Sequence, residues 1–204
     1  HLIVTQDADV EMTASNVVAS ATGCCGQRCM AASVLLTVGD VGAVLERIVE
    51  KMREIIPGET MGPMISKEAR DRALGYLTRA KARGCKILVD GREEFSLPEK
   101  GFFIAPSLVE CCDAKDEMAQ DEIFAPILTL IRCSSLEEAL EIENNCPYGN
   151  AASLYTSSGK AAQKFISEAQ SGMLGVNVGV PVPREPFPFG GWNASSFGEG
   201  DLTG

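Results

Sequence analysis

Histidine is almost missing from this sequence, since His1 is the only histidine among 204 residues. A cysteine hydrolase usually needs a histidine base, and a residue at the first position is a poor candidate for that task. The composition therefore disfavours a protease or an amidase. Zinc sites use cysteines and histidines at closed spacings. Because histidine is so scarce and no second cysteine cluster follows the first, we expect no metal.

Long hydrophobic runs and an excess of basic residues are also lacking. No apolar run approaches the roughly 18 residues that a membrane-spanning helix needs. The formal net charge is -10 at pH 7, so nucleic acid and anionic membranes would on average be repelled. We expect neither as a partner. Hydrophobic residues make up 45% of the chain and charged residues 23%, which is typical of a globular domain.

The eight cysteines follow neither a disulfide framework nor a redox motif. Disulfide frameworks stabilise chains too short to build a core, and this chain is long enough to build one. A CxxC pair is absent. We therefore expect a reducing compartment, which is the cytoplasm of a bacterium or the mitochondrial matrix.

What the sequence does contain is a repeated alternation of strand-like and helical segments. The strand-like segments are unbroken apolar runs, which predicts an α/β fold with a mainly parallel open sheet flanked by helices. We expect residues 1–180 to form one domain and residues 181–204, rich in Pro and Gly, to be a loop-rich segment of the same domain. The expected strands cover 31–38, 86–89, 102–112, 127–132, 151–155 and 173–178, after an apolar start at residues 1–4; the expected helices cover 10–22, 40–55, 66–83, 135–145 and 158–170.

Three cysteines gather in the stretch GCCGQRCM, from Gly23 to Met30. One interpretation makes them small apolar core residues, because free cysteine is among the most buried residue types. The other makes Cys29 a nucleophile. A neighbouring positive charge such as Arg28 favours the thiolate, and Gly26 permits a tight turn that could aim backbone N–H groups at an oxyanion. The spacing leaves both interpretations open.

If Cys29 is a nucleophile, the class of reaction is restricted. Hydrolysis lacks a histidine base, and thiol exchange lacks a CxxC pair. What remains is addition of the thiol to an aldehyde, where a hydride leaves to a cofactor and histidine need not remove the proton.

Four motifs together resemble the aldehyde dehydrogenase family. They occur in the family's order and spacing, and the resemblance covers essentially the whole chain. Within the family the sequence most resembles the methylmalonate-semialdehyde dehydrogenases, through GQRCMA, NCPYGN and GMLGVNVGVPVPREPFPFGG. The four motifs are GQRC at 26–29, EIFAP at 122–126, PYGN at 147–150 and PFGG at 188–191.

The resemblance implies a role for each of five residues. Cys29 would attack the aldehyde and carry a thioester, while its backbone N–H would help to hold the oxyanion. Glu122 would bind the nicotinamide ribose of NAD, and Phe124 would line the nicotinamide side. Phe189 would line the aldehyde tunnel. Arg28 would bind a substrate carboxylate, because a planar guanidinium suits that task.

The resemblance also implies partners that the motifs do not contain. The substrate would be a small aldehyde, malonate or methylmalonate semialdehyde, and coenzyme A would take the acyl group to give acetyl- or propionyl-coenzyme A. We expect an N-terminal NAD-binding domain outside these residues, a parent homodimer or homotetramer, and little activity from this chain alone. Two alternatives stay open: a relative that releases a free acid, and a domain without catalytic activity.

Overall fold

Seven strands form the central sheet of the computed structural model, which describes residues 1–111, 113–187 and 189–196. The strands are β1 (Leu2–Thr5), β2 (Val34–Val38), β3 (Lys86–Val89), β4 (Ser107–Glu110), β5 (Ile127–Cys133), β7 (Ala151–Tyr155) and β8 (Met173–Val176). Their order is β3-β4-β5-β2-β1-β7-β8, and every neighbouring pair is parallel except β3 with β4. The predicted α/β class with a mainly parallel open sheet is confirmed.

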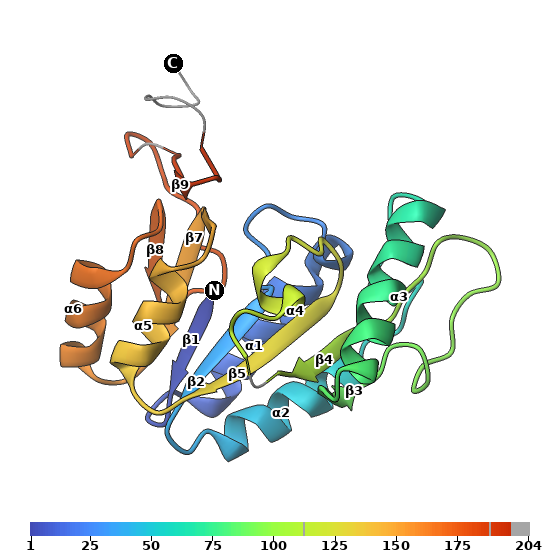
Figure 1. The fold of residues 1–204 in the computed structure, drawn as a ribbon, viewed down its shortest axis with the longest axis horizontal. Coiled ribbons are helices and arrows are strands. Elements are labelled where there is room, and N and C mark those ends of the chain that lie inside the picture. The colour runs from blue at the N-terminus through green and yellow to red at the C-terminus, as the bar shows by residue number, and fades with distance from the viewer. Residues whose placement is uncertain (112, 188, 197–204) are drawn as a thin grey trace.

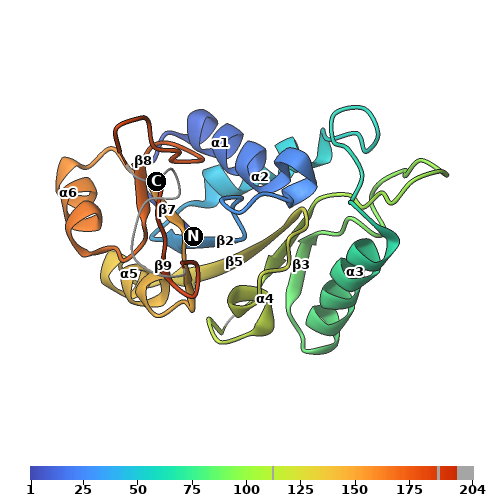
Figure 2. The ribbon, with the colours of Figure 1, turned by 90° about the horizontal axis from the view of Figure 1, so that it is seen from above.

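Helices cover both faces of this sheet. They are α1 (Val10–Thr22), α2 (Gly42–Arg53), α3 (Lys67–Ala82), the single turn α4 (Glu117–Gln120), α5 (Leu136–Asn144) and α6 (Gly159–Glu168). Figure 2 shows α1 and α2 over one face, with α3, α4 and α5 over the other. The helix α6 lies beyond β7 and β8 at one end of the sheet (Figure 1).

Alternate residues of each central strand enter different cores, which explains why the strands are largely apolar. Leu2 and Val4 of β1 pack in the cluster that contains residues of α1 and α2. Ile3, between them, packs in the cluster that contains Phe165 of α6 and residues of α5. A strand buried on both faces has no solvent side on which to place polar residues.

Most helices begin where their capping residues predict. Asp9 accepts a hydrogen bond from the Met12 N–H at 2.8 Å, and Ser66 accepts one from the Ala69 N–H at 3.1 Å. Such side-chain oxygens satisfy N–H groups that the first helical turn leaves free. The exception is α2, which has Val41 rather than Asp40 at its N-cap, although the Asp40 carboxylate still accepts the Gly42 N–H at 3.1 Å.

Residues 181–187 and 189–196 are loops and turns apart from β9 (Trp192–Asn193), which pairs antiparallel with β6 (Tyr148–Gly149). The sequence did not predict this pair of strands. A two-residue strand is too short for a periodic pattern to predict. The predicted strand over 102–112 is also shorter, and its last residue lies outside the described part. No helix among the described residues combines the length and the apolar character needed to cross a bilayer.

Candidate active site

A cavity of about 120 Å³ opens at the edge of the sheet where several parallel strands begin. Its lining includes Leu2 at the start of β1, Ser33 just before β2, Ile127 at the start of β5 and Ala151 at the start of β7. Ligand crevices in open α/β sheets usually lie at the carboxyl ends of the strands. This cavity lies at the opposite edge, so a general rule of the fold class would not have located it.

The stretch from Gly23 to Met30 reaches this cavity through a left-handed turn. Helix α1 ends at Thr22, and Cys24 and Cys25 then adopt φ angles of 52° and 56°, followed by Gly26 at 67°. Left-handed backbone costs a residue with a side chain about 1–2 kcal/mol. Such conformations persist only where the surrounding structure holds them, and they concentrate at functional sites.

The three cysteines of this turn have different environments. Cys25 is fully buried, and burial raises the pKa of its thiol to about 12. Cys24 and Cys29 are exposed, and Cys29 lines the cavity. The core interpretation therefore describes Cys25, whereas Cys29 is accessible to a small molecule. None of the seven cysteines in the described ranges forms a disulfide.

Gly26 joins the thiol turn to the EIFAP segment. A Cβ atom on Gly26 would stand 2.2 Å from the carbonyl oxygen of Ala125 and 2.7 Å from the nitrogen of Pro126. Both contacts are with main-chain atoms, which cannot swing aside as a side chain could. The glycine therefore allows two segments about a hundred residues apart in the sequence to touch.

The EIFAP segment brings Glu122 and Phe124 to the same cavity as Cys29. Both side chains are exposed, and Phe124 has a left-handed φ of 58°. Arg72 of α3 holds the backbone of this segment, because its guanidinium donates to the carbonyl of Ile123 at 2.7 Å and to that of Glu122 at 3.3 Å.

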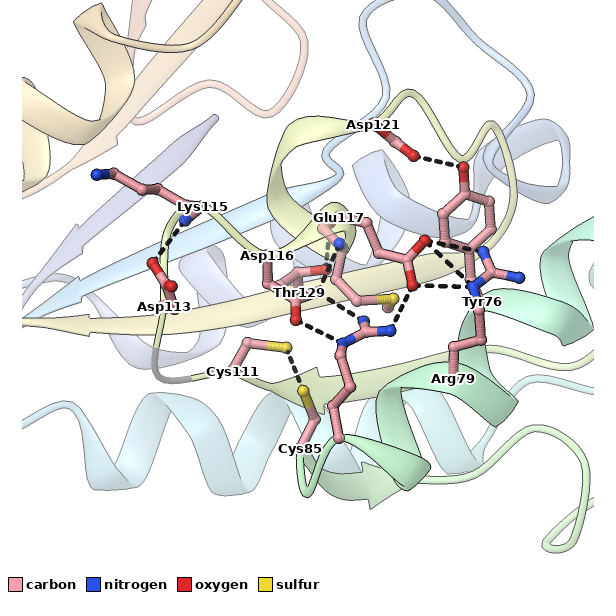
Figure 3. A network of polar contacts seen from close by, with 12 residues as sticks. Tyr76, Arg79, Cys85, Cys111, Asp113, Lys115, Asp116, Glu117, Asp121 and Thr129 are labelled. Carbon is pink, nitrogen blue, oxygen red and sulfur yellow. Dashed lines mark hydrogen bonds and ion pairs between the residues drawn. The ribbon is translucent and has the colours of Figure 1, made fainter.

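A second contact from α3 supports the residue just before the EIFAP segment. The Tyr76 hydroxyl donates to a carboxylate oxygen of Asp121 at 2.8 Å (Figure 3). Burial raises the pKa of Tyr76, and the hydrogen bond to Asp121 raises it further. The phenol therefore stays protonated and keeps donating across the neutral pH range.

Arg28 also lines the cavity, but its guanidinium is engaged elsewhere. Its Nη2 donates to the carbonyl of Ala19 at 2.8 Å and to that of Ser20 at 3.3 Å, near the C-terminal end of α1. The buried Nε has no partner among the described residues. Gly23 makes room for this arrangement, because a Cβ there would overlap the guanidinium at 1.9 Å from Nη2.

Two further side chains, which the sequence analysis did not single out, fix the thiol turn. The Gln27 amide donates to the carbonyl of Pro63 at 3.3 Å and accepts the N–H of Ile65 at 2.8 Å. Asn150 donates to the carbonyl of Cys29 at 3.4 Å. Both residues belong to motifs that carry the family resemblance, and that membership was the only signal for them.

The predicted site residues are thus mostly brought together. Arg28, Cys29, Glu122 and Phe124 line one cavity, from two stretches of chain. Phe189 is half-buried on the Pro-rich segment and does not line it. Its neighbour Pro188, the first residue of the PFGG motif, lies outside the described residues.

Comparison with known proteins identifies the family of the chain. A family model described as "Aldehyde dehydrogenase family" matches residues 1–203. Malonate-semialdehyde dehydrogenase 2 of Bacillus thuringiensis (strain Al Hakam) is 38% identical over 98% of this chain. Malonate-semialdehyde dehydrogenase 1 of Geobacillus kaustophilus (strain HTA426) is 40% identical over 100% of it. The chain spans 42% and 43% of the length of these two relatives.

Solved structures share the fold closely. A methylmalonate-semialdehyde dehydrogenase from Oceanimonas doudoroffii superposes with a TM-score of 0.92 at 33% identity, covering 98% of this chain and 43% of that one. A Sinorhizobium meliloti 1021 protein complexed with NAD superposes with a TM-score of 0.93 at 35% identity, with the same coverage.

Proposed function

Since this chain belongs to the aldehyde dehydrogenase family, we propose that Cys29 is the nucleophile of an NAD-dependent aldehyde oxidation. The substrate is malonate or methylmalonate semialdehyde. The acyl group passes from Cys29 to coenzyme A, and loss of carbon dioxide gives acetyl- or propionyl-coenzyme A. Because the chain spans less than half the length of its relatives, we propose that complete turnover also needs an NAD-binding domain outside these residues, in a parent homodimer or homotetramer.

The observation that carries this proposal is the shared cavity of Cys29 and Glu122. An exposed thiol on a constrained turn lies in the same cavity as an exposed carboxylate and an exposed aromatic ring. The contact between Gly26 and Ala125 couples their positions. Exposure alone does not distinguish Cys29, because Cys24 is exposed as well, but of these two cysteines Cys29 alone lines the cavity.

The thiol turn can perform the first covalent step with its own groups. The Cys29 thiolate attacks the aldehyde carbon, and the carbonyl oxygen becomes the oxyanion of a thiohemiacetal. Within the described part of the chain, no acceptor is paired with the backbone N–H of Cys29. That N–H is free to donate to the oxyanion, and such a donor contributes about 3–4 kcal/mol to catalysis in comparable sites.

Two residues of the cavity lining support the binding of a nicotinamide nucleotide. Glu122 offers a carboxylate that can accept two ribose hydroxyls, and Phe124 offers an apolar ring beside it. When bound, NAD would supply the hydride acceptor for the oxidation. Arg72 would hold Glu122 in place through the backbone, because it bonds the carbonyls of residues 122 and 123.

We propose that Arg28 and Phe189 select the substrate. The Nε of Arg28 is buried and has no partner in the described part of the chain, and Arg28 belongs to the cavity lining; both observations support binding of a carboxylate. Its Nη2 would keep its bonds to α1 or exchange them for the substrate. We propose that Phe189 borders the aldehyde path, on the strength of the family resemblance alone.

The test uses alkylation of the chain by iodoacetamide, followed by tryptic mapping. Trypsin cuts after Arg28, so Cys24 and Cys25 fall in peptide 1–28 and Cys29 falls in peptide 29–47. We expect Cys29 to be alkylated fastest and malonate semialdehyde to protect it by forming the thiohemiacetal. At ten times the half-protecting concentration, labelling of Cys29 should slow about tenfold.

Cys24 is the matched control, because it is also exposed and lies five residues away. Its labelling in peptide 1–28 should not respond to the aldehyde. A Cys29→Ser variant should lose all protected labelling. If Cys29 reacts no faster than Cys24, and the semialdehyde protects neither, the thiol is not an aldehyde-binding nucleophile and the proposal is wrong.

A further inference from the structure

A pair of thiols lies outside the cavity just described. The Sγ atoms of Cys85 and Cys111 are 3.0 Å apart (Figure 3). Nonbonded carbon atoms in contact stand roughly 3.5–4.0 Å apart, so the two sulfurs are in close contact. Cys111 is buried and Cys85 is partly exposed.

The sheet places these two residues opposite each other. Cys85 immediately precedes β3 and Cys111 immediately follows β4, and the antiparallel register pairs Lys86 with Glu110. One step further along the ladder pairs Cys85 with Cys111. Opposite residues in an antiparallel pair have Cα atoms about 4.5–5.5 Å apart, which lies within the roughly 4.4–6.8 Å that a disulfide requires.

The backbone on both sides of this pair is held in place. The Cys85 N–H donates to the carbonyl of Ala80 in α3 at 3.0 Å, and the Cys111 N–H donates to the carbonyl of Leu130 in β5 at 3.0 Å. The thiols therefore meet because their strands are fixed, and closing the bond to about 2.05 Å needs a shift of about 1 Å.

Asp116 lies within 4.8 Å of both sulfurs, so a metal site must be considered. Both of its carboxylate oxygens are already bonded by the Arg83 guanidinium, at 2.8 and 2.9 Å. A guanidinium beside the site opposes a second cation. Two thiolates on one tetrahedral zinc would also stand about 3.8 Å apart, given Zn–S bonds of about 2.3 Å. The observed contact favours a bond between the sulfurs over a bound metal.

We propose that Cys85 and Cys111 form a redox-active dithiol that a peroxide converts to a cross-strand disulfide. The sulfur of Cys85, the more exposed of the two thiols, attacks a peroxide oxygen and breaks the O–O bond. The thiol proton joins the leaving hydroxide as one water, and a sulfenic acid remains on Cys85. The Cys111 thiol then displaces the sulfenic oxygen as a second water. Two thiols and one hydrogen peroxide thus give one disulfide and two waters. Burial raises the pKa of Cys111, as does its hydrogen bond to Cys85, so Cys111 stays protonated and the peroxide meets Cys85 first.

Tryptic mapping of the oxidised chain tests this proposal. Cys85 falls in the tripeptide 84–86, and Cys111 falls in peptide 101–115 together with Cys112. In a Cys24→Ser, Cys29→Ser background, one equivalent of hydrogen peroxide should lower the mass by two hydrogens and link these two peptides. Dithiothreitol should reverse the link. This background lacks the proposed catalytic thiol, so the result does not depend on the function proposed above.

The variants distinguish the pair from its neighbours. Cys85→Ser should abolish the link, whereas Cys112→Ser should leave it intact, because the register assigns Cys111 as the partner. Loss of the link in Cys112→Ser, or no link in the parent background, would overturn the proposal. Retention of one equivalent of Zn²⁺ that blocks oxidation would also overturn it, in favour of a metal site.

Discussion

Replacing Gly26 with alanine tests whether the thiol turn depends on its contact with the EIFAP segment. The substitution adds a Cβ to a residue with a φ of 67°, which costs about 1–2 kcal/mol. It also places that Cβ 2.2 Å from the Ala125 carbonyl oxygen, and overpacking of this kind adds about 1–3 kcal/mol. We therefore expect Gly26→Ala to lower the free energy of unfolding by about 2–5 kcal/mol.

Gly84 provides a matched control for the backbone part of this cost. Its φ is 88°, and a Cβ there would meet nothing within 4 Å. Gly84→Ala should therefore lower the free energy of unfolding only by the cost of the left-handed backbone, about 1–2 kcal/mol. Gly62, which has neither a left-handed φ nor a close neighbour, should tolerate alanine with little change.

Urea unfolding of the three variants gives their free energies of unfolding, provided that these free energies fall with urea concentration at the same slope. For a chain of this size each kcal/mol also lowers the melting temperature by about 2–4 °C. The alkylation rate of Cys29 should change in Gly26→Ala and stay as it is in Gly84→Ala. If Gly26→Ala costs no more than Gly84→Ala, the contact with Ala125 contributes nothing and does not couple the two motifs.

Three other predictions concern the same site. Arg28→Leu should weaken protection of Cys29 by malonate semialdehyde more than protection by propanal in the alkylation assay, and equal losses would reject carboxylate binding by Arg28. Arg72→Ala removes two bonds to the backbone around Glu122, so hydrogen exchange in peptides spanning 118–128 should rise while exchange in α1 stays unchanged. Burial in the folded chain raises the pKa of Cys25 to about 12 from an ordinary 9.0. Above about pH 9 the unfolded chain loses this proton while the folded chain keeps it, so the free energy of unfolding should fall as the pH rises. In Cys25→Ala, the free energy of unfolding measured in urea should decline less at alkaline pH. An unchanged decline would contradict this role of Cys25.

Local signals in the sequence predicted most of the elements. Helix α1 runs over the predicted residues 10–22 because Asp9 caps it and Gly23 ends it. The β3 strand also matches its prediction. These boundaries depend on neighbouring residues, and neighbouring residues are what a sequence shows directly. The β6–β9 pair was missed because its two strands lie more than forty residues apart and are two residues long.

The candidate site also contains residues that the sequence predicted and contacts that it did not. The motifs identified Cys29, Glu122 and Phe124, and the structure places all three around one cavity. The hydrogen bonds from Arg72 were not predictable. Arg72 lies fifty positions before Glu122 in the sequence, and the hydrophobic pattern of its helix indicates only which side chains are buried. The engagement of Arg28 with α1 likewise depends on how the chain folds back on itself.

The left-handed run at Cys24, Cys25 and Gly26 has a consequence for how this turn can vary. A mutational scan with stability selection should tolerate asparagine, aspartate and glycine at the exposed position 24, since these residues enter that conformation most easily. It should reject asparagine and aspartate at position 25, because that side chain is fully buried. Valine, isoleucine and threonine should be eliminated at both positions, even at the exposed position 24, where the surface alone would permit almost any side chain. The narrowest choice of residues in this part of the chain would then be set by the main chain rather than by the chemistry of the thiols.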